Sequence, residues 1–74
     1  MTLDEGTIGR PYTVERADLP TGIDKRMEAL GMTRGTLVTL LRKKRSGTAV
    51  MELRGTRFAV GRDITTKITV KEAR

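Results

Sequence analysis

One short segment, residues 21–35, carries the start and stop signals of a helix inside a sequence that otherwise alternates like strands. Thr21 stands at the N-cap position, where its hydroxyl would accept a hydrogen bond from a backbone N–H of the first turn. Asp24 follows three residues later, near the positive end of the helix dipole. Gly31 stands where a C-terminal residue with left-handed backbone belongs. We therefore expect one inserted α-helix over about residues 22–31.

The apolar side chains of this predicted helix fall into a single stripe. Ile23, Met27 and Leu30 are spaced at i, i+4 and i+7, as on one face of an α-helix. Met32, just past the cap glycine, can fold back onto that stripe, and Gly35 closes a turn before the next apolar run. One helix inside a small strand-rich chain narrows the choice of fold.

The remaining segments alternate with a period of two, which is typical of half-buried strands. Ser46-Gly47 and Gly55 mark tight hairpin turns, and residues 61–65 form a short connector of about one helical turn. The predicted strands cover residues 10–16, 36–44, 48–54, 56–60 and 67–71. Strands this short and closely spaced must curl to hide their edges. The prediction is a mainly β fold, a small five-stranded, partly open barrel.

Alternation also predicts which side chains of these strands face the core. The inward set is Tyr12, Val14, Val38, Leu40, Ala49, Met51, Leu53, Phe58, Val60, Ile68 and Val70. Tyr12 and Phe58, the only aromatic residues of the chain, both belong to this set. The sheet is therefore expected to offer no exposed aromatic platform on which bases could stack.

The amino-acid composition says more about the function of the chain than about its fold. The 74 residues suffice for a single domain, residues 1–74, and they include neither cysteine nor histidine. The chain therefore lacks thiolate metal ligands, the commonest metal-binding side chain and the commonest general base. The N-terminus has no apolar core of a secretory signal, and no apolar run approaches the length of a membrane span. We expect a cytoplasmic protein that does not insert into membranes.

The acidic residues and the glycines of the sequence do not point to catalysis or to a bound cofactor either. Asp24 and Glu28 share a predicted helix face at i and i+4, but such a pair next to Lys25 is more typical of a solvated, salt-bridged surface than of a metal site. The glycines are spaced as turn residues, and none forms a phosphate-binding loop ahead of a lysine. We expect no enzymatic activity, no cofactor and no bound metal.

Three segments resemble the FeoA family of bacterial ferrous-iron transport proteins, namely KRMEALGMTRGTLVTLLRKK, VMELRGTRFAV and the closing KITV. The resemblance runs from about Gly9 to Val70 and is sharpest from Met27 to Gly35. It implies a Src-homology-3-like barrel with an inserted helix. It also implies a non-enzymatic accessory or regulatory protein of ferrous iron uptake. The implied partner is the FeoB transporter, a membrane protein with a cytoplasmic GTPase domain, which would recruit the chain to the inner face of the cytoplasmic membrane.

The sequence departs from the family pattern at three places. Arg34 stands where the family often has proline before the turn glycine, Thr65 replaces an alanine before the last strand, and Met27 replaces a leucine. The shared motif consists of glycines and apolar positions, so it identifies the fold better than it identifies any chemistry.

Leu30, Met32 and Arg34, at the junction of helix and barrel, form the candidate partner-binding site. Small barrels of this class often bind extended peptides along a groove. Leu30 and Met32 also suit core and cap positions, whereas Arg34 has no evident structural need and could meet a carboxylate of the partner.

A basic run, Arg42, Lys43, Lys44 and Arg45, lies at the predicted tip of the first hairpin, in a chain with a net charge of +6. The run favours an alternative function, a small basic nucleic-acid-binding barrel that grips phosphates. It is also typical of a hairpin whose charge prevents edge-to-edge aggregation. Because no aromatic platform is expected, nucleic acid is the weaker of the functional alternatives.

A third alternative is a detached regulatory barrel like that of iron-dependent repressors, which shares the FeoA-like fold. Those proteins join the barrel to a DNA-binding part, whereas this sequence starts at Met1 with no helix-turn-helix segment. We therefore expect a free-standing protein. Strand edges in a partly open barrel can also pair between copies, so a homo-oligomer is compatible with the sequence.

Overall fold

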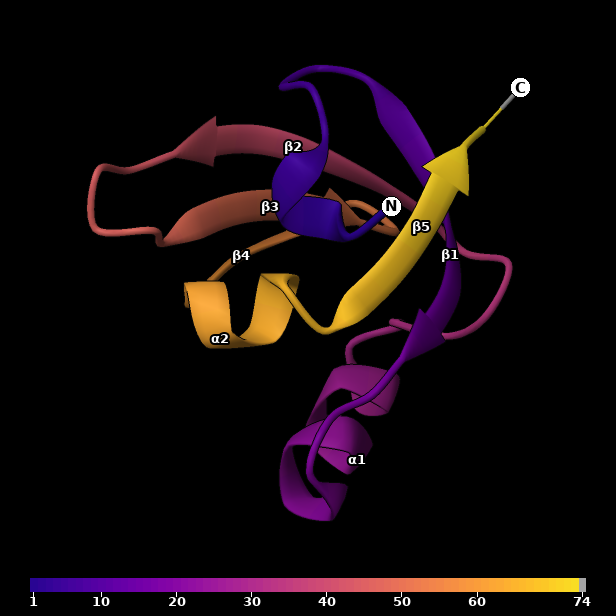
Figure 1. Cartoon of the computed structure of the whole chain (residues 1–74). Helices are drawn as coiled ribbons and strands as arrows, with labels where there is room; N and C mark the ends of the chain where they lie inside the picture. Colours follow the sequence, from indigo (N-terminus) through magenta and orange to yellow (C-terminus); the bar gives the residue numbers. More distant parts are fainter. Residues whose placement is uncertain (74) are drawn as a thin grey trace.

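The computed structural model describes residues 1–73 and builds them around one antiparallel sheet (Figure 1). In chain order the elements are the 3-10 helix η1 (Leu3–Glu5), β1 (Pro11–Ala17), α1 (Thr21–Ala29), β2 (Leu37–Lys43), β3 (Ala49–Leu53), β4 (Thr56–Val60), α2 (Arg62–Thr65) and β5 (Ile68–Glu72). The strands lie in the order β4-β3-β2-β1-β5, with every neighbouring pair antiparallel. The predicted mainly β fold with an inserted helix is confirmed.

Two bulges interrupt the ladders of the sheet. The register shifts between Val14 and Arg16 where β1 pairs with β5, and between Leu40 and Arg42 where β2 pairs with β3. Each bulge bends its strand and increases the local twist. Within residues 1–73 no ladder joins β4 to β5, so the barrel is partly open, as predicted.

The core lies inside the curl of this sheet. Its buried apolar side chains are Leu3, Tyr12, Val14, Met27, Met32, Val38, Leu40, Ala49, Met51, Leu53, Val60, Ile68 and Val70. Every side chain predicted to face inward is among them except Phe58, which packs against the core but is only partly buried. Phe58 faces the core as predicted, opposite the buried Met51, but it stays partly buried because β4 is an edge strand and no further strand covers its outer side in the described residues.

The N-terminal residues, to which the sequence analysis assigned no element, complete the core. Leu3 is fully buried, and η1 packs against β5 and α2. Thr2 pairs with Thr69, and the Val70 N–H donates to the Met1 carbonyl at 2.8 Å. These contacts cover part of the outer edge of β5. Among the described residues, β4 is therefore the edge that is left open.

A tyrosine hydroxyl holds the loop after η1 against the barrel. The Thr7 N–H donates to the Tyr12 hydroxyl oxygen at 2.7 Å. Donation by Thr7 favours the phenolate, so it lowers the pKa of Tyr12 from its usual value of 10.0. A second bond, from the Gly9 N–H to the Leu40 carbonyl at 2.8 Å, ties the same loop to β2. The loop is thus attached at two points although Ile8 is exposed.

Helix α1 ends as the sequence predicts. The Gly31 N–H donates to the Glu28 carbonyl at 2.9 Å. The Met32 N–H donates to the Met27 carbonyl, also at 2.9 Å. With Gly31 at φ +104°, these two bonds form a Schellman cap. Met32 is turned back into the core, where it is 3% exposed.

The start of α1 differs from the prediction, and the predicted N-cap role of Thr21 is wrong. Pro20 is the N-cap, Thr21 is the first helical residue, and no side chain caps the helix by a hydrogen bond. Pro20 has φ −55° and ψ 148°, the extended conformation that an N-cap needs and that the proline ring favours. The Asp24 N–H closes the first turn on the Pro20 carbonyl at 2.8 Å.

Gly31 also brings the helix cap against the β3–β4 hairpin, because a Cβ at this position would lie 2.7 Å from Leu53 Cδ2. We predict that Gly31→Ala lowers the free energy of unfolding by about 3 kcal/mol, since it combines a left-handed φ with a collision in the core. Gly35→Ala is the matched control, because its φ is +89° and a Cβ there would meet nothing within 4 Å. It should cost only about 1 kcal/mol. Urea unfolding measures both, and equal losses would contradict the packing role of Gly31.

Candidate partner-binding site

A groove lies between α1 on one side and β4 and α2 on the other. Its volume is about 340 Å³, within the range of roughly 300–1,000 Å³ that is usual for ligand pockets. Its lining residues are Ile23, Arg26, Met27, Leu30, Phe58, Ala59, Val60, Gly61 and Ile64. Most of these side chains are apolar, so the groove suits an apolar segment of a partner.

The groove includes part of β4, since the consecutive residues 58–60 are among those that line it. β4 is also an edge strand of the sheet. Among residues 1–73, β3 is the only strand that pairs with β4. Alternate N–H and C=O groups on the outer side of β4 are therefore available to an added strand.

Large apolar side chains at this groove remain accessible to a partner. Leu30 is 37% exposed, and Phe58 is partly buried. Met27, earlier on the same helix stripe, is 2% exposed and attaches α1 to the core. Helix α1 thus uses the middle of its apolar stripe for folding and leaves the last member of the stripe at the surface.

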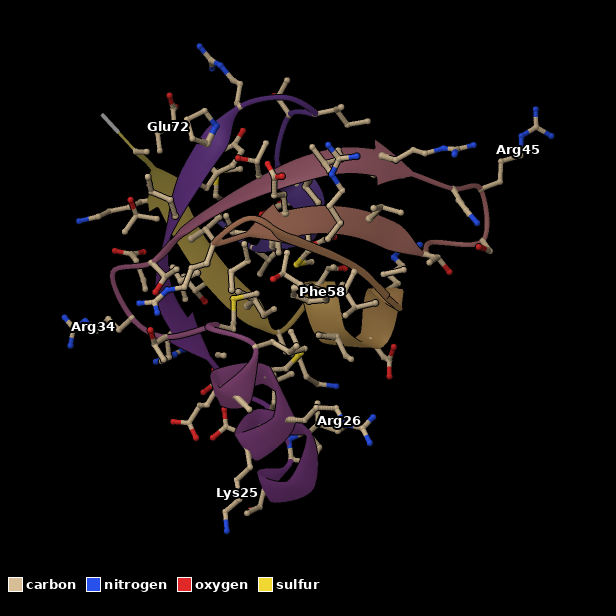
Figure 2. All side chains as sticks on the ribbon, turned by 180° about the vertical axis from the view of Figure 1, so that it is seen from behind. Lys25, Arg26, Arg34, Arg45, Phe58 and Glu72 are labelled. Atoms are coloured by element: carbon tan, nitrogen blue, oxygen red, sulfur yellow. The ribbon has the colours of Figure 1, made fainter. Side chains whose placement is uncertain are left out.

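Arg26 gives the groove a positive charge. It lines the groove, and it makes no ion pair with another residue of the described chain, 1–73. Figure 2 shows Arg26 extending from α1 and Phe58 lying beside α2. A partner segment that combines apolar side chains with a carboxylate would complement this surface.

The structure separates the three residues that the sequence analysis placed in the partner site. Leu30 lines the groove, whereas Met32 belongs to the core beneath the helix cap. Arg34 is exposed and projects outward from the turn after α1, as Figure 2 shows. It lines a different hollow, together with Leu37 and Glu52. Leu30 and Arg34 would therefore meet different parts of a partner.

Arg26, Phe58 and Ile64 line the groove although no sequence pattern marks them as residues of this site. The alternation of β4 correctly puts Phe58 on the inner side, but its exposure depends on strand order. β4 is an edge because β5 pairs with β1 and not with β4. Ile64 lies on a single helical turn, too short for periodicity to indicate which way its side chain points.

The predicted basic hairpin is present, and a further cation joins it. Lys43 is the last residue of β2, and Arg42 stands beside the bulge in that strand. Lys44 and Arg45 lie in the turn, from which Arg45 projects in Figure 2. Arg62 of α2 lines a hollow together with the last three cations of the run.

The described residues contain neither a cluster of metal ligands nor a membrane-spanning helix. Between residues 1 and 73, no three acidic side chains converge closely enough to hold a metal ion. Asp24 and Glu28 lie on one helix face, as their spacing indicates, and two carboxylates do not fit a selective metal site. In the same part of the chain, no helix has both the length and the apolar character that crossing a membrane requires.

The fold defines a class of protein, the small SH3-like barrels, here with a helix inserted after the first strand. The family model of the FeoA domain matches residues 1–72. The chain belongs to the FeoA family. The match extends beyond the predicted span of residues 9–70 and includes η1, in agreement with the place of Leu3 in the core. No curated protein sequence matches the chain.

Solved structures of FeoA proteins share this fold. The FeoA protein of Chlorobium tepidum superposes with a TM-score of 0.93 at 24% identity, over 100% of this chain and 71% of that one. Iron(II) transport protein A of Clostridium thermocellum gives 0.90 at 15% identity, over 99% of this chain but 46% of that one. FeoA of Stenotrophomonas maltophilia, described as a prokaryotic SH3 domain protein and solved with zinc, gives 0.81 at 26% identity, over 96% and 89%.

Burial separates the surface of the groove from the core beneath it. We predict that Leu30→Ser changes the free energy of unfolding by less than about 1 kcal/mol, because this side chain is already partly in water. Met27→Ala should cost about 2–5 kcal/mol, since it empties a buried position. Urea unfolding of the two variants measures the contrast. A loss at Leu30 as large as that at Met27 would identify Leu30 as a core residue and not a groove residue.

Proposed function

We propose that this chain is a non-enzymatic accessory protein of ferrous iron uptake that binds the cytoplasmic part of a FeoB-type GTPase transporter. The observation that carries the proposal is the FeoA match over residues 1–72. A role in activating ferrous iron transport has been suggested for the S. maltophilia FeoA, and the C. thermocellum relative is described as an iron(II) transport protein. Membership of the same family supports a related role here.

The proposed contact is a segment of the transporter's cytoplasmic part that lies in the groove between α1 and β4. Leu30 and Phe58 would bury apolar surface against it, and Arg26 would pair with one of its carboxylates. The open edge of β4 would add backbone hydrogen bonds. Each of these interactions uses a feature that folding alone leaves unsatisfied or partly exposed.

Such a contact regulates the transporter if the groove prefers one conformation of its partner. A tenfold difference in affinity corresponds to about 1.4 kcal/mol, which a single side-chain contact can supply. The chain needs no reaction of its own for this, and a single domain of residues 1–74 without histidine or cysteine suits the role. It would act in the cytoplasm, at the inner face of the membrane that holds the transporter.

Substitutions in the groove test the proposed contact. Leu30→Asp and Arg26→Glu should each weaken binding to the purified GTPase part of the transporter about tenfold, because they place a carboxylate against apolar surface or reverse the charge. Ile8→Asp is the matched control, since Ile8 is 51% exposed and lies outside the groove. It should change the affinity less than about twofold.

Isothermal titration calorimetry measures these affinities and separates the two parts of the proposal. If the wild-type chain has no affinity for the GTPase part, the partner is wrong. If the wild-type chain binds and the groove variants bind equally well, the partner stands and the groove is wrong.

Arg34→Glu tests the prediction that Arg34 meets a carboxylate of the partner at a second point of contact. The substitution should weaken binding about tenfold. The melting temperature should not change, because Arg34 is exposed and makes no ion pair within residues 1–73. Calorimetry and a thermal melt of the same preparation measure both quantities, and unaltered binding would limit the contact to the groove.

A further inference from the structure

A second hollow lies between the β2–β3 hairpin, η1 and α2. Figure 1 shows the hairpin loop extending on the same side as α2. The residues that line the hollow, here called the basic pocket, are Asp4, Lys43, Lys44, Arg45, Gly47, Ala49, Arg62 and Thr65. They come from three separate parts of the chain, so the pocket exists only in the folded protein.

Positive charge dominates the basic pocket. Lys43, Lys44, Arg45 and Arg62 supply four cations, and Asp4 is the only carboxylate among the lining residues. None of these four cations forms an ion pair with another residue between 1 and 73. The Asp4 carboxylate already accepts a hydrogen bond from the Thr2 hydroxyl. Charges of one sign gathered in a hollow raise the local concentration of an anion.

Packing holds two of these cations in place before any ligand arrives. Gly47 has φ +96°, and a Cβ on it would lie 3.0 Å from Arg62 Cβ and 3.3 Å from Arg62 Cδ. The stem of Arg62 therefore lies against the hairpin turn. The Lys43 ammonium donates to the Asp4 carbonyl at 2.7 Å, which ties the end of β2 to η1.

Three cationic side chains around the pocket are left for a ligand. Among residues 1–73, the side chains of Lys44, Arg45 and Arg62 have no hydrogen-bond acceptor in the protein. Arg45 projects outward from the turn, as Figure 2 shows, so it would have to turn back to reach a ligand in the pocket. A guanidinium presents paired N–H groups that match two oxygens of a phosphate, and an ammonium adds a point charge. This set of donors recognises the phosphate group better than a single carboxylate, which has only two oxygens to share among three cations.

The dimensions of the basic pocket limit the ligand further. Its volume is about 200 Å³, below the roughly 300–1,000 Å³ of pockets that enclose a whole small molecule. The chain has only two aromatic side chains, and neither lines this pocket, so the pocket offers no aromatic platform for a base. The space and the donors fit one or two phosphate groups without a nucleoside.

We propose that the basic pocket binds a compact phosphate anion, a phosphomonoester or a pyrophosphate group. The group belongs either to a free small molecule or to the headgroup of a lipid, because the chemistry that the pocket recognises is the same in both. This site is separate from the groove between α1 and β4, so it stands or falls independently of the proposed transporter contact.

Isothermal titration of the full chain with sodium pyrophosphate tests the site. We expect saturable one-to-one binding. Arg62→Gln should reduce the affinity about tenfold, because it removes a charge-assisted bidentate contact. Lys71→Gln is the matched control, since it makes the same change in net charge at an exposed position of β5 outside the pocket. It should change the affinity less than about twofold.

Circular dichroism of each variant confirms that the fold is retained. Lys44→Gln provides a second test that should also reduce the affinity, because Lys44 is exposed at the hairpin and lines the pocket. Absence of saturable binding would overturn the proposal. So would equal losses in Arg62→Gln and Lys71→Gln, since that result reports net charge and not a site. Binding of duplex DNA but not of pyrophosphate would also overturn it, in favour of a nucleic-acid surface.

Vesicle sedimentation distinguishes the two sources of the phosphate. The probe is phosphatidylcholine vesicles that contain phosphatidic acid, compared with vesicles in which phosphatidylglycerol supplies the same charge. Binding to phosphatidic acid that pyrophosphate competes away assigns the site to a lipid headgroup. Pyrophosphate binding without preference between the vesicles assigns it to a free phosphate compound.

Discussion

The rest of the structure depends on covering the inner face of one short, strongly bent sheet. Its strands are five to seven residues long, and β4 and β5 do not pair within the described residues. A sheet of this size cannot bury all of its inward-facing apolar side chains by itself, because its curl leaves two openings to solvent. Leu3 from η1 covers one part of the core, and Met27 and Met32 around the end of α1 cover another. Unbranched methionine suits such irregular junctions because it adapts its shape.

The same arrangement explains why one strand edge is left open. The N-terminal residues pair with β5 and cover part of its edge, while no segment between residues 1 and 73 does this for β4. An open edge promotes aggregation unless it carries charge or is used for binding. β4 shows both devices, because Arg57 pairs across the hairpin with Glu52 at 3.7 Å and the apolar groove runs beside the strand. A partner segment in this groove would complete the sheet that folding leaves incomplete.

Helix α2 contributes to both proposed binding surfaces. Ile64 lines the apolar groove, while Arg62, two residues earlier, lines the basic pocket. Residues at this spacing point in different directions on a helical turn. A single turn of four residues therefore separates an apolar surface from a cationic one. Under the two proposals, this division would let two different partners bind at once, or let one partner contact an apolar and a cationic surface.

Much of the fold follows from local sequence. Strand alternation correctly assigned the inward side chains of β1, β2, β3 and β5, and Gly31 with Met32 correctly marked the end of α1. These signals act through neighbouring residues, because a period of two and a left-handed glycine have the same meaning in any tertiary context. Thr21 misled the prediction of the helix start, since Pro20 competes for the N-cap and its ring already holds the extended backbone that this position needs.

The tertiary structure alone decided which surfaces are exposed. The exposure of Phe58 depends on the strand order that makes β4 an edge, and the burial of Leu3 depends on the path of the N-terminus across β5. The position of Arg62 beside the basic hairpin depends on contact between residues far apart in the chain. The sequence by itself therefore determined the strands, the inserted helix, the family and most of the core. The groove and the pocket required the fold, because both are formed by segments that only long-range packing brings together.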